Sequence, residues 1–427
     1  MSAVASSRTQ PDPSSMAANA MALIDDLARL SDEPGRLTRL YLSPAHRRAA
    51  DLVRRRMIEA GLAASIDAAG TVVGRYEGSR PGLPALLLGS HIDTVRDAGR
   101  FDGTLGVAVA LAVVADLARR NRRLPFAIEV LAFGDEEGTR FPSTLAGSRA
   151  LAGTFAVPTL DERDADGTSL GEALLGFGCD PEAIPAAARR PQDVLFYLEL
   201  HIEQGKILEH ADQALGIVSG ISGAMRLGCK VEGVSGHAGT LAMPERRDAL
   251  CGASEMVLAI EAIAGRNPSV VATVGQLAVE PGAVNVVPGS AVFTLDLRTL
   301  DDAERHRMLG EILQCCDAIA RRRGLTFRHE TTYDQPTTFC DAALKTRLAG
   351  ALAGFGLDPV EMQSGAGHDG LAVAALCPMA MLFVRCKDGV SHHPDEDVSA
   401  GDIRIACTVL SHFLEEPWPE PRSADGK

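Results

Sequence analysis

Short apolar runs alternate with helix-like stretches along most of the chain. The apolar runs are too short to be ordinary helices and are mostly uninterrupted by charge, which is typical of strands buried on both faces. A helix is predicted from Ser43-Pro44, which fit the N-cap and N1 positions, to Gly61. The predicted strands are Ala85–Leu88, Ala127–Phe133, Val194–Leu200 and Met379–Val384, with helices at Thr104–Leu117, Ser143–Leu151 and toward Leu414. This alternation predicts an α/β fold with a mixed, largely parallel sheet flanked by helices.

The middle of the chain follows a different order. Between Ala224 and about Tyr333 the predicted elements run β-α-β-β-α-β, which is the split-βαβ pattern of ferredoxin-like domains. The predicted strands are Met225–Val234, Val270–Val279, Ala291–Leu297 and Leu325–Thr331, and the helices are Asp248–Ala264 and Ala303–Arg323. We therefore expect an α+β domain inserted into the α/β domain.

The domain boundaries follow from these patterns. We expect a first domain from residues 19–220 and 336–416, an inserted domain at 221–335, and disordered tails at 1–18 and 417–427. The segment Asp161–Pro191, rich in Asp, Gly, Pro and Ala, is predicted to be a loop excursion of the first domain.

The composition and net charge of the chain argue against nucleic acid and membranes as partners. The 427 residues carry 42 basic and 56 acidic side chains, a net charge of −14, without a block of Lys and Arg, so nucleic acid and membrane surfaces are not expected partners. The longest uncharged apolar stretches run 11 residues, short of the roughly 20 that a membrane span needs. The N-terminus has no apolar signal segment, and the nine cysteines are never spaced C-x-x-C, so we expect a cytoplasmic protein without a thiolate metal site.

Histidines and carboxylates follow all four predicted parallel strands. Because open α/β sheets bind ligands at the carboxyl ends of their strands, we expect these side chains to converge. Singly, each would be read as a loop residue or a helix cap, but four coincident strand ends favour a site. The residues are His91 and Asp93, His201 and Glu203, Asp135, Glu136 and Glu137, and His392 and His393, with Asp102 in the loop before the Thr104 helix.

Imidazole and carboxylate ligands without thiolate suit catalytic divalent metals such as Zn²⁺, Mn²⁺ or Co²⁺. Two His and at least three carboxylates could fill a two-metal site, which clamps and activates a shared water. Asp93 is spaced to orient the His91 imidazole. In the acidic run that ends at Glu137, one carboxylate can bind metal while its neighbour serves as general base.

Several motifs together resemble the hydantoinase/carbamoylase branch of the aminoacylase-like dinuclear metallohydrolases. The resemblance spans about Leu40 to Leu414 and implies a zinc-exopeptidase-like catalytic domain with an inserted lid and dimerisation domain. The motifs are G-S-H-I-D-T-V, F-D-G-T-L-G-V, D-E-E-G-T-R-F, E-L-H-I-E-Q-G, G-H-A-G-T, N-V-V-P-G, D-L-R, S-G-A-G-H-D-G and V-S-H-H-P-D-E.

This resemblance implies a role for each matching residue. The metal ligands would be His91, Asp102, Glu137, His201 and His392, with Asp102 bridging two ions and His392 preferred over His393. The catalytic residues would be Glu136 as the base, His237 as the group that polarises the scissile carbonyl, and Asp93. The cofactors would be two divalent ions, Mn²⁺ or Zn²⁺, with Co²⁺ or Ni²⁺ as alternatives.

The substrate contacts also come from the resemblance. Asn285 and Arg298 match positions that hold a substrate carboxylate, His237 faces the carbonyl, and Gln204 matches a substrate-contacting Gln. An Arg fork suits a carboxylate because it binds both oxygens. His368 and Asp369, in a glycine loop that borders the active site in relatives, would support the metal ligands. A homodimer through the inserted lid domain is also implied.

The implied reaction is hydrolysis of a ureido C–N bond on a small carboxylate substrate. The G-S-H-I-D-T-V and R-F-P segments resemble bacterial allantoate amidohydrolases, which favours allantoate and a place in purine catabolism. The alternatives are an N-carbamoyl-L-amino-acid hydrolase or β-ureidopropionase and, more distantly, a dipeptidase or aminoacylase. A binding protein that had kept only the fold would lack ligands or the base, and all of them are present.

Overall fold

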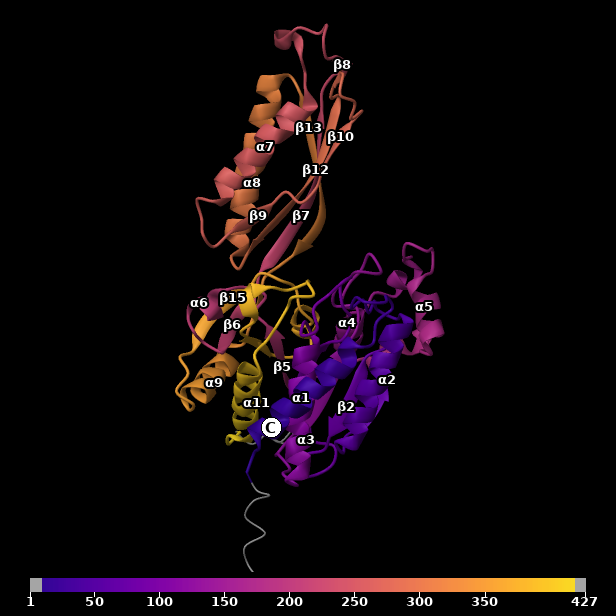
Figure 1. The fold of residues 1–427 in the computed structure, drawn as a ribbon, viewed down its shortest axis with the longest axis vertical. Coiled ribbons are helices and arrows are strands. Elements are labelled where there is room, and N and C mark those ends of the chain that lie inside the picture. Colours follow the sequence, from indigo (N-terminus) through magenta and orange to yellow (C-terminus); the bar gives the residue numbers. More distant parts are fainter. Residues whose placement is uncertain (1–9, 419–427) are drawn as a thin grey trace, which may run out of the picture. The chain divides into compact units, whose positions relative to one another are not determined.

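The structure, a computed structural model, describes residues 10–418. Within these residues the chain forms two units (Figure 1). The first unit takes in the chain up to Ser219 and again from Cys340, and the second unit is Gly220–Phe339. None of the described helices is long and apolar enough to cross a membrane.

The first unit is built on a mixed sheet. Its strands are β1 (Ala63–Ile66), β2 (Val72–Tyr76), β3 (Ala85–His91), β4 (Ala127–Phe133), β5 (Val194–Ile202), β6 (Leu215–Ile221), β15 (Val360–Ser364) and β16 (Met379–Val384). They lie in the order β1-β2-β4-β3-β5-β16-β6, and β15 also pairs with β6. The pairs β4–β3, β3–β5 and β5–β16 are parallel, whereas the outer pairs β1–β2, β2–β4 and β16–β6 are antiparallel. The predicted mixed, largely parallel sheet is therefore confirmed, and its parallel centre is made of the four strands read from the sequence.

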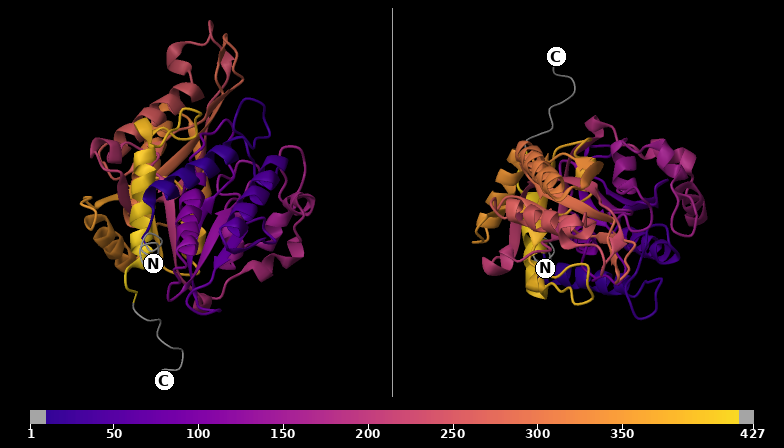
Figure 2. Two further views of the ribbon diagram at one scale, coloured as in Figure 1. Left: turned by 60° about the horizontal axis from the view of Figure 1, so that its bottom comes forward. Right: turned by 90° about the horizontal axis from the view of Figure 1, so that it is seen from above.

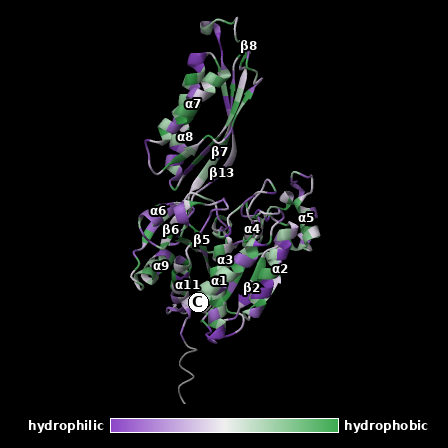
Figure 3. Cartoon of the chain, in the orientation of Figure 1, coloured by the Kyte–Doolittle hydropathy of each residue, from purple (hydrophilic) through white to green (hydrophobic). Residues whose placement is uncertain are grey.

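Helices cover both faces of this sheet. The helices of the first unit are α1 (Pro13–Ala28), α2 (Pro44–Glu59), α3 (Thr104–Arg119), α4 (Ala146–Ala152), α5 (Leu170–Phe177), α6 (Ile207–His210), α9 (Ala342–Ala353), α10 (Gly370–Val373) and α11 (Ala400–Glu415). Helix α3, which is hydrophobic over most of its length (Figure 3), packs against β3 and β5 and contacts α1 and α11. Leu198 and Leu200 of β5 belong to the apolar core between this helix and the sheet. Because side chains alternate along a strand, Glu199 and His201 point to the opposite face, where α10 begins.

The second unit is an α+β sandwich. Its strands are β7 (Gly223–Glu232), β8 (Gly236–His237), β9 (Val271–Thr273), β10 (Leu277–Glu280), β11 (Val286–Val287), β12 (Ser290–Thr299), β13 (Thr326–Gln335) and β14 (Thr338–Phe339), with helices α7 (Ala249–Ala264) and α8 (Asp302–Arg323). The main sheet has the antiparallel order β10-β12-β7-β13, with β9 also on β12. Each helix connects strands that are separated by one other strand, which is the split-βαβ arrangement. Helices α7 and α8 lie side by side on the sheet and share one apolar core with it (Figures 1 and 2).

Three expected segments differ from the structure. Helix α1 begins at Pro13, capped by Asp12, so the tail expected at 1–18 is ordered from there; its residues 1–9 lie outside the described part. At the other end Trp418 stacks on Phe196 with ring centroids 5.0 Å apart, and residues 419–427 of the expected tail are outside the described range. The single strand expected at Val270–Val279 is interrupted and forms β9 and β10.

The excursion at Asp161–Pro191 is also more ordered than a loop. It contains α5, whose first turn is closed by a capping box between Ser169 and Glu172. Short 3₁₀ turns flank it at Val157–Asp161, Pro181–Ala187 and Pro191–Asp193, and others lie at Met243–Glu245 and Lys387–Gly389.

Candidate metal centre

The four parallel strands of the first unit end beside one another and carry the candidate ligands. His91 is the last residue of β3, His201 lies one residue before the end of β5, and Glu136 and Glu137 follow β4. His392 comes after β16, and Asp102 comes from the loop that enters α3. The parallel order β4-β3-β5-β16 therefore brings residues that are up to about 300 positions apart to one sheet edge.

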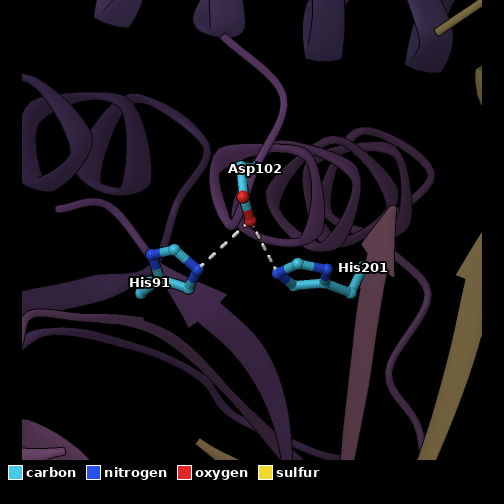
Figure 4. Close-up of side chains that lie close together, drawn as sticks. All are labelled: His91, Asp102 and His201. Carbon is cyan, nitrogen blue, oxygen red and sulfur yellow. Dashed lines mark ion pairs between the residues drawn. The ribbon is translucent and has the colours of Figure 1, made fainter. Parts of the chain in front are cut away.

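One group of candidate ligands consists of His91, Asp102 and His201, all of them buried (Figure 4). Oδ1 of Asp102 lies 3.0 Å from Nε2 of His201 and 3.6 Å from Nε2 of His91. The dashed lines in Figure 4 join these atoms, and both rings point toward the same carboxylate.

A second group consists of Asp102, Glu137 and His392. Nε2 of His392 lies 3.2 Å from Oδ2 of Asp102 and 3.5 Å from Oε2 of Glu137. His393 instead faces Asp395, with its Nδ1 3.5 Å from a carboxylate oxygen of that residue. Asp102 thus belongs to both groups, and each of its oxygens faces a different one.

The backbone sets the tautomer of the two buried histidines. Nδ1 of His91 lies 3.0 Å from the carbonyl oxygen of Asp93, and Nδ1 of His201 lies 3.0 Å from that of Ile202. A carbonyl only accepts, so each Nδ1 carries the proton and the neutral ring keeps a lone pair on Nε2. Both Nε2 atoms are buried and make no hydrogen bond to the described residues. Orphaned imidazole nitrogens facing carboxylate oxygens fit a divalent metal, which needs such neutral donors.

The charges at this edge depend on one another. Burial alone would raise the pKa of Asp102, but the imidazoles of His201, His392 and His91 hold it well below its usual range. Contact with Asp102 in turn raises the pKa of His392 to about 9. Burial, with Asp102 nearby, raises the pKa of Glu137 to about 7. The closely spaced carboxylates are stable only with positive charge nearby. Protonated histidines can supply this charge, and bound cations would supply it in their place.

Glu136 lies beside the first group without belonging to either. Its Oε2 is 3.7 Å from Nε2 of His91, and burial raises the pKa of its carboxyl well above the usual range. Asp93 holds this segment, because its two carboxylate oxygens accept the backbone N–H groups of Glu136 and Glu137 at 3.3 Å each. Asp93 therefore fixes the acidic loop with its side chain and orients His91 mainly with its backbone carbonyl.

Two residues that the sequence pattern did not single out support Asp102. Ser391 Oγ lies 2.9 Å from Oδ2 of Asp102, and Glu396 accepts the backbone N–H of Asp102 at 3.0 Å. Gln204, expected to contact substrate, donates from Nε2 to the same Oδ2 at 3.0 Å. The run V-S-H-H-P-D-E contains both Ser391 and Glu396, but nothing in that run shows that they face a loop almost 300 residues earlier.

A buried polar layer lies under the histidines. Glu199 accepts a hydrogen bond from Ser90 at 2.9 Å and one from the backbone N–H of Gly370 at 3.2 Å. The ring of His368 packs edge-on to His201, with centroids 4.5 Å apart, and its Nε2 lies 2.8 Å from Ser364 Oγ. Asp369 is fully buried next in sequence. His368 thus packs against a candidate ligand, and Glu199 is a further buried carboxylate in this layer that the sequence pattern did not single out.

The other expected substrate residues lie in the second unit. His237 on β8 is exposed and sits next to Asn285, because Val286 of β11 pairs with His237 and Asn285 accepts from the N–H of Ala238 at 2.9 Å. Arg298 lies at the far end of the ten-residue strand β12 and pairs with Asp296, Nε to Oδ1 2.7 Å. Within this unit the structure brings His237 and Asn285 together and keeps Arg298 apart from them.

Comparisons by family model, by sequence and by structure all place the chain among related hydrolases. Residues 87–416 match the model of peptidase family M20/M25/M40. The chain is 41% identical to an N-carbamoyl-L-amino acid amidohydrolase of Geobacillus stearothermophilus over 91% of this chain and 95% of that protein. It is 39% identical to an allantoate deiminase of Arabidopsis thaliana, over 93% and 81% of the two chains. A crystal structure of a hydantoinase/carbamoylase family amidase from Burkholderia multivorans superposes with a TM-score of 0.86 at 33% identity and covers 93% of this chain and 97% of that one.

Proposed function

The chain belongs to peptidase family M20/M25/M40, and from that premise we propose that it hydrolyses a ureido C–N bond of a small carboxylate substrate. It is an amidohydrolase that acts on C–N bonds other than peptide bonds, and the resemblance to hydantoinase/carbamoylase amidases read from the sequence is confirmed. The observation that carries the proposal is the carboxylate of Asp102, which faces two ligand groups with Glu136 beside one of them.

The proposed chemistry assigns each residue a task. His91, His201, Glu137 and His392 would hold two divalent cations, Mn²⁺ or Zn²⁺, and Asp102 belongs to both ligand groups. When bound, such cations lower the pKa of water to about 7. Glu136 accepts the proton of the attacking water, and burial raises the pKa of its carboxyl, which favours the protonated form that this step produces. It then returns the proton to the leaving nitrogen, and the released carbamate decomposes to CO₂ and ammonia.

The second unit supplies the proposed substrate contacts. His237 polarises the carbonyl oxygen, where negative charge develops. Asn285 and Arg298 bind the substrate carboxylate and, because they lie apart within one chain, they reach it from different chains of the homodimer proposed below. Gln204 of the first unit assists. The substrate we favour is allantoate, because the segments around His91 and Glu137 resemble those of bacterial allantoate enzymes. The compartment we propose is the cytoplasm. An N-carbamoyl-L-amino acid is the second candidate, favoured by the 41% identity to the Geobacillus enzyme.

A substrate panel separates these candidates. The purified enzyme with Mn²⁺ or Zn²⁺ is given allantoate, an N-carbamoyl-L-amino acid, β-ureidopropionate and a dipeptide, and ammonia and free amino acid are measured. We expect kcat/KM for allantoate to exceed that for the other compounds by roughly tenfold or more. Faster release from the N-carbamoyl-L-amino acid would make the second candidate correct, and cleavage of the dipeptide alone would contradict the proposed bond type.

The base is tested by Glu136→Gln. The amide cannot accept the proton, so we expect turnover to fall by roughly 10²–10⁴-fold, the usual contribution of general acid–base catalysis. Metal content, measured by plasma mass spectrometry, should stay at the wild-type level because Glu136 is in neither ligand group. Near-normal turnover in this variant would contradict the assignment of the base.

We further propose a homodimer formed through the second unit. This unit exposes large apolar side chains, with Leu258 of α7 65% exposed and Val271 of β9 57% exposed, and such residues are common at interfaces. Sedimentation velocity should give a particle of two chains, and Leu258→Glu should shift it toward one. The matched control is Val157→Glu, an equally exposed residue of the first unit (61%), which should leave the dimer intact. A monomeric wild type, or disruption by Val157→Glu alone, would contradict the proposal.

A further inference from the structure

Glu396 is a buried carboxylate directly behind Asp102. Only 3% of its surface is exposed. Its Oε1 accepts the backbone N–H of Phe101 at 2.7 Å and that of Asp102 at 3.0 Å. The backbone N–H of Glu396 donates to the carbonyl of His393 at 3.0 Å, which places the residue in the turn that follows His392. Glu396 therefore joins the loop that carries Asp102 to the loop that carries His392.

A second connection runs through Ser391. The hydroxyl Oγ of Ser391 lies 3.1 Å from Oε2 of Glu396 and 2.9 Å from Oδ2 of Asp102. Its one hydrogen serves one of these oxygens at a time. Gln204 Nε2 donates both to this hydroxyl at 3.1 Å and to Oδ2 of Asp102 at 3.0 Å. Glu396 thus holds the backbone of Asp102, and Ser391 and Gln204 hold its Oδ2.

The Asp102 loop has space for this arrangement only because two of its positions are glycine. A Cβ on Gly99 would lie 2.3 Å from the Cβ of Glu396, and a Cβ on Gly103 would lie 2.4 Å from the ring of His91. Gly103 also has φ +64°, where other residues are strained. The loop is therefore pressed against Glu396 at one end and against a ligand ring at the other.

We propose that Glu396 is a positioning residue that fixes the bridging carboxylate of Asp102, acting through the amides of Phe101 and Asp102 and through Ser391. This inference rests on the proposed two-metal centre. A shared carboxylate must present one oxygen to each ligand group, and rotation or displacement of the Asp102 loop would remove that shared orientation. Glu396 is in neither ligand group. It acts on metal affinity by holding Asp102, as residues behind metal ligands commonly do.

The test compares Glu396→Ala, Glu396→Gln and wild type by isothermal titration of the metal-free proteins with Zn²⁺ or Mn²⁺. Wild type should bind two ions. In Glu396→Ala we expect a loss of affinity of roughly 10–100-fold, the range usual for outer-shell partners of metal ligands. Glu396→Gln should recover most of it, because the amide oxygen can accept the same two N–H groups. Circular dichroism and thermal unfolding of the metal-free proteins are measured alongside.

The matched control is Asp67→Ala. Asp67 Oδ1 also accepts two backbone N–H groups, from Ala69 and Thr71 at 2.9 Å each, but it is in neither ligand group. This variant should lower the unfolding temperature and leave metal affinity unchanged. If Glu396→Ala behaves in the same way, Glu396 only stabilises the fold and the inference is overturned.

Two further outcomes are decisive. If Glu396→Ala does not fold, Ser391→Ala takes its place, and an unchanged metal affinity in that folded variant would overturn the connection through Ser391. If wild type itself does not bind two ions, the proposed metal centre is wrong. If wild type and Glu396→Ala bind two ions equally well, the metal centre stands and the proposed role of Glu396 is overturned.

Discussion

The carboxylate of Asp102 imposes the main constraint on the first unit. A charged group that is 97% removed from solvent is costly unless positive or hydrogen-bonding partners surround it, and only 3% of Asp102 is exposed. Its two oxygens face three imidazoles, and its backbone is held by Glu396. These partners come from the ends of β3 and β5 and from the loop after β16, so the position of one carboxylate depends on the packing of the whole sheet edge.

The fold meets this constraint with its parallel centre. The strands β4, β3, β5 and β16 are nearly fully buried. Their parallel register places His91 opposite Phe133 at the end of β4 and His201 opposite Phe383 of β16. Gln204 and His392 have positive φ, +59° and +55°, and Asp135 has φ +73°. Such backbone is uncommon outside glycine and is concentrated at functional sites, where the surrounding structure compensates its cost. The site thus combines rigid strands with strained turns that aim individual side chains.

Much of this could be predicted from the sequence because the signals are local. Short, largely apolar runs marked the four parallel strands, and Ser43-Pro44 marked the start of α2. The histidines stood out because they follow those runs directly. Helix α5 was missed although Ser169 and Glu172 have capping-box spacing, since the composition around them favoured a loop. The roles of Ser391 and Glu396 had no local signal, because their partners lie 289 to 295 residues away and only the folded sheet edge brings them together.

We propose that Asp102 bridges two cations, and anomalous X-ray diffraction from crystals grown with Zn²⁺, collected at the zinc absorption edge, would locate both ions. We expect two anomalous peaks per chain, one among His91, Asp102 and His201 and the other among Asp102, Glu137 and His392, each about 2 Å from its ligand atoms. A single peak, or two peaks that do not share Asp102, would contradict it.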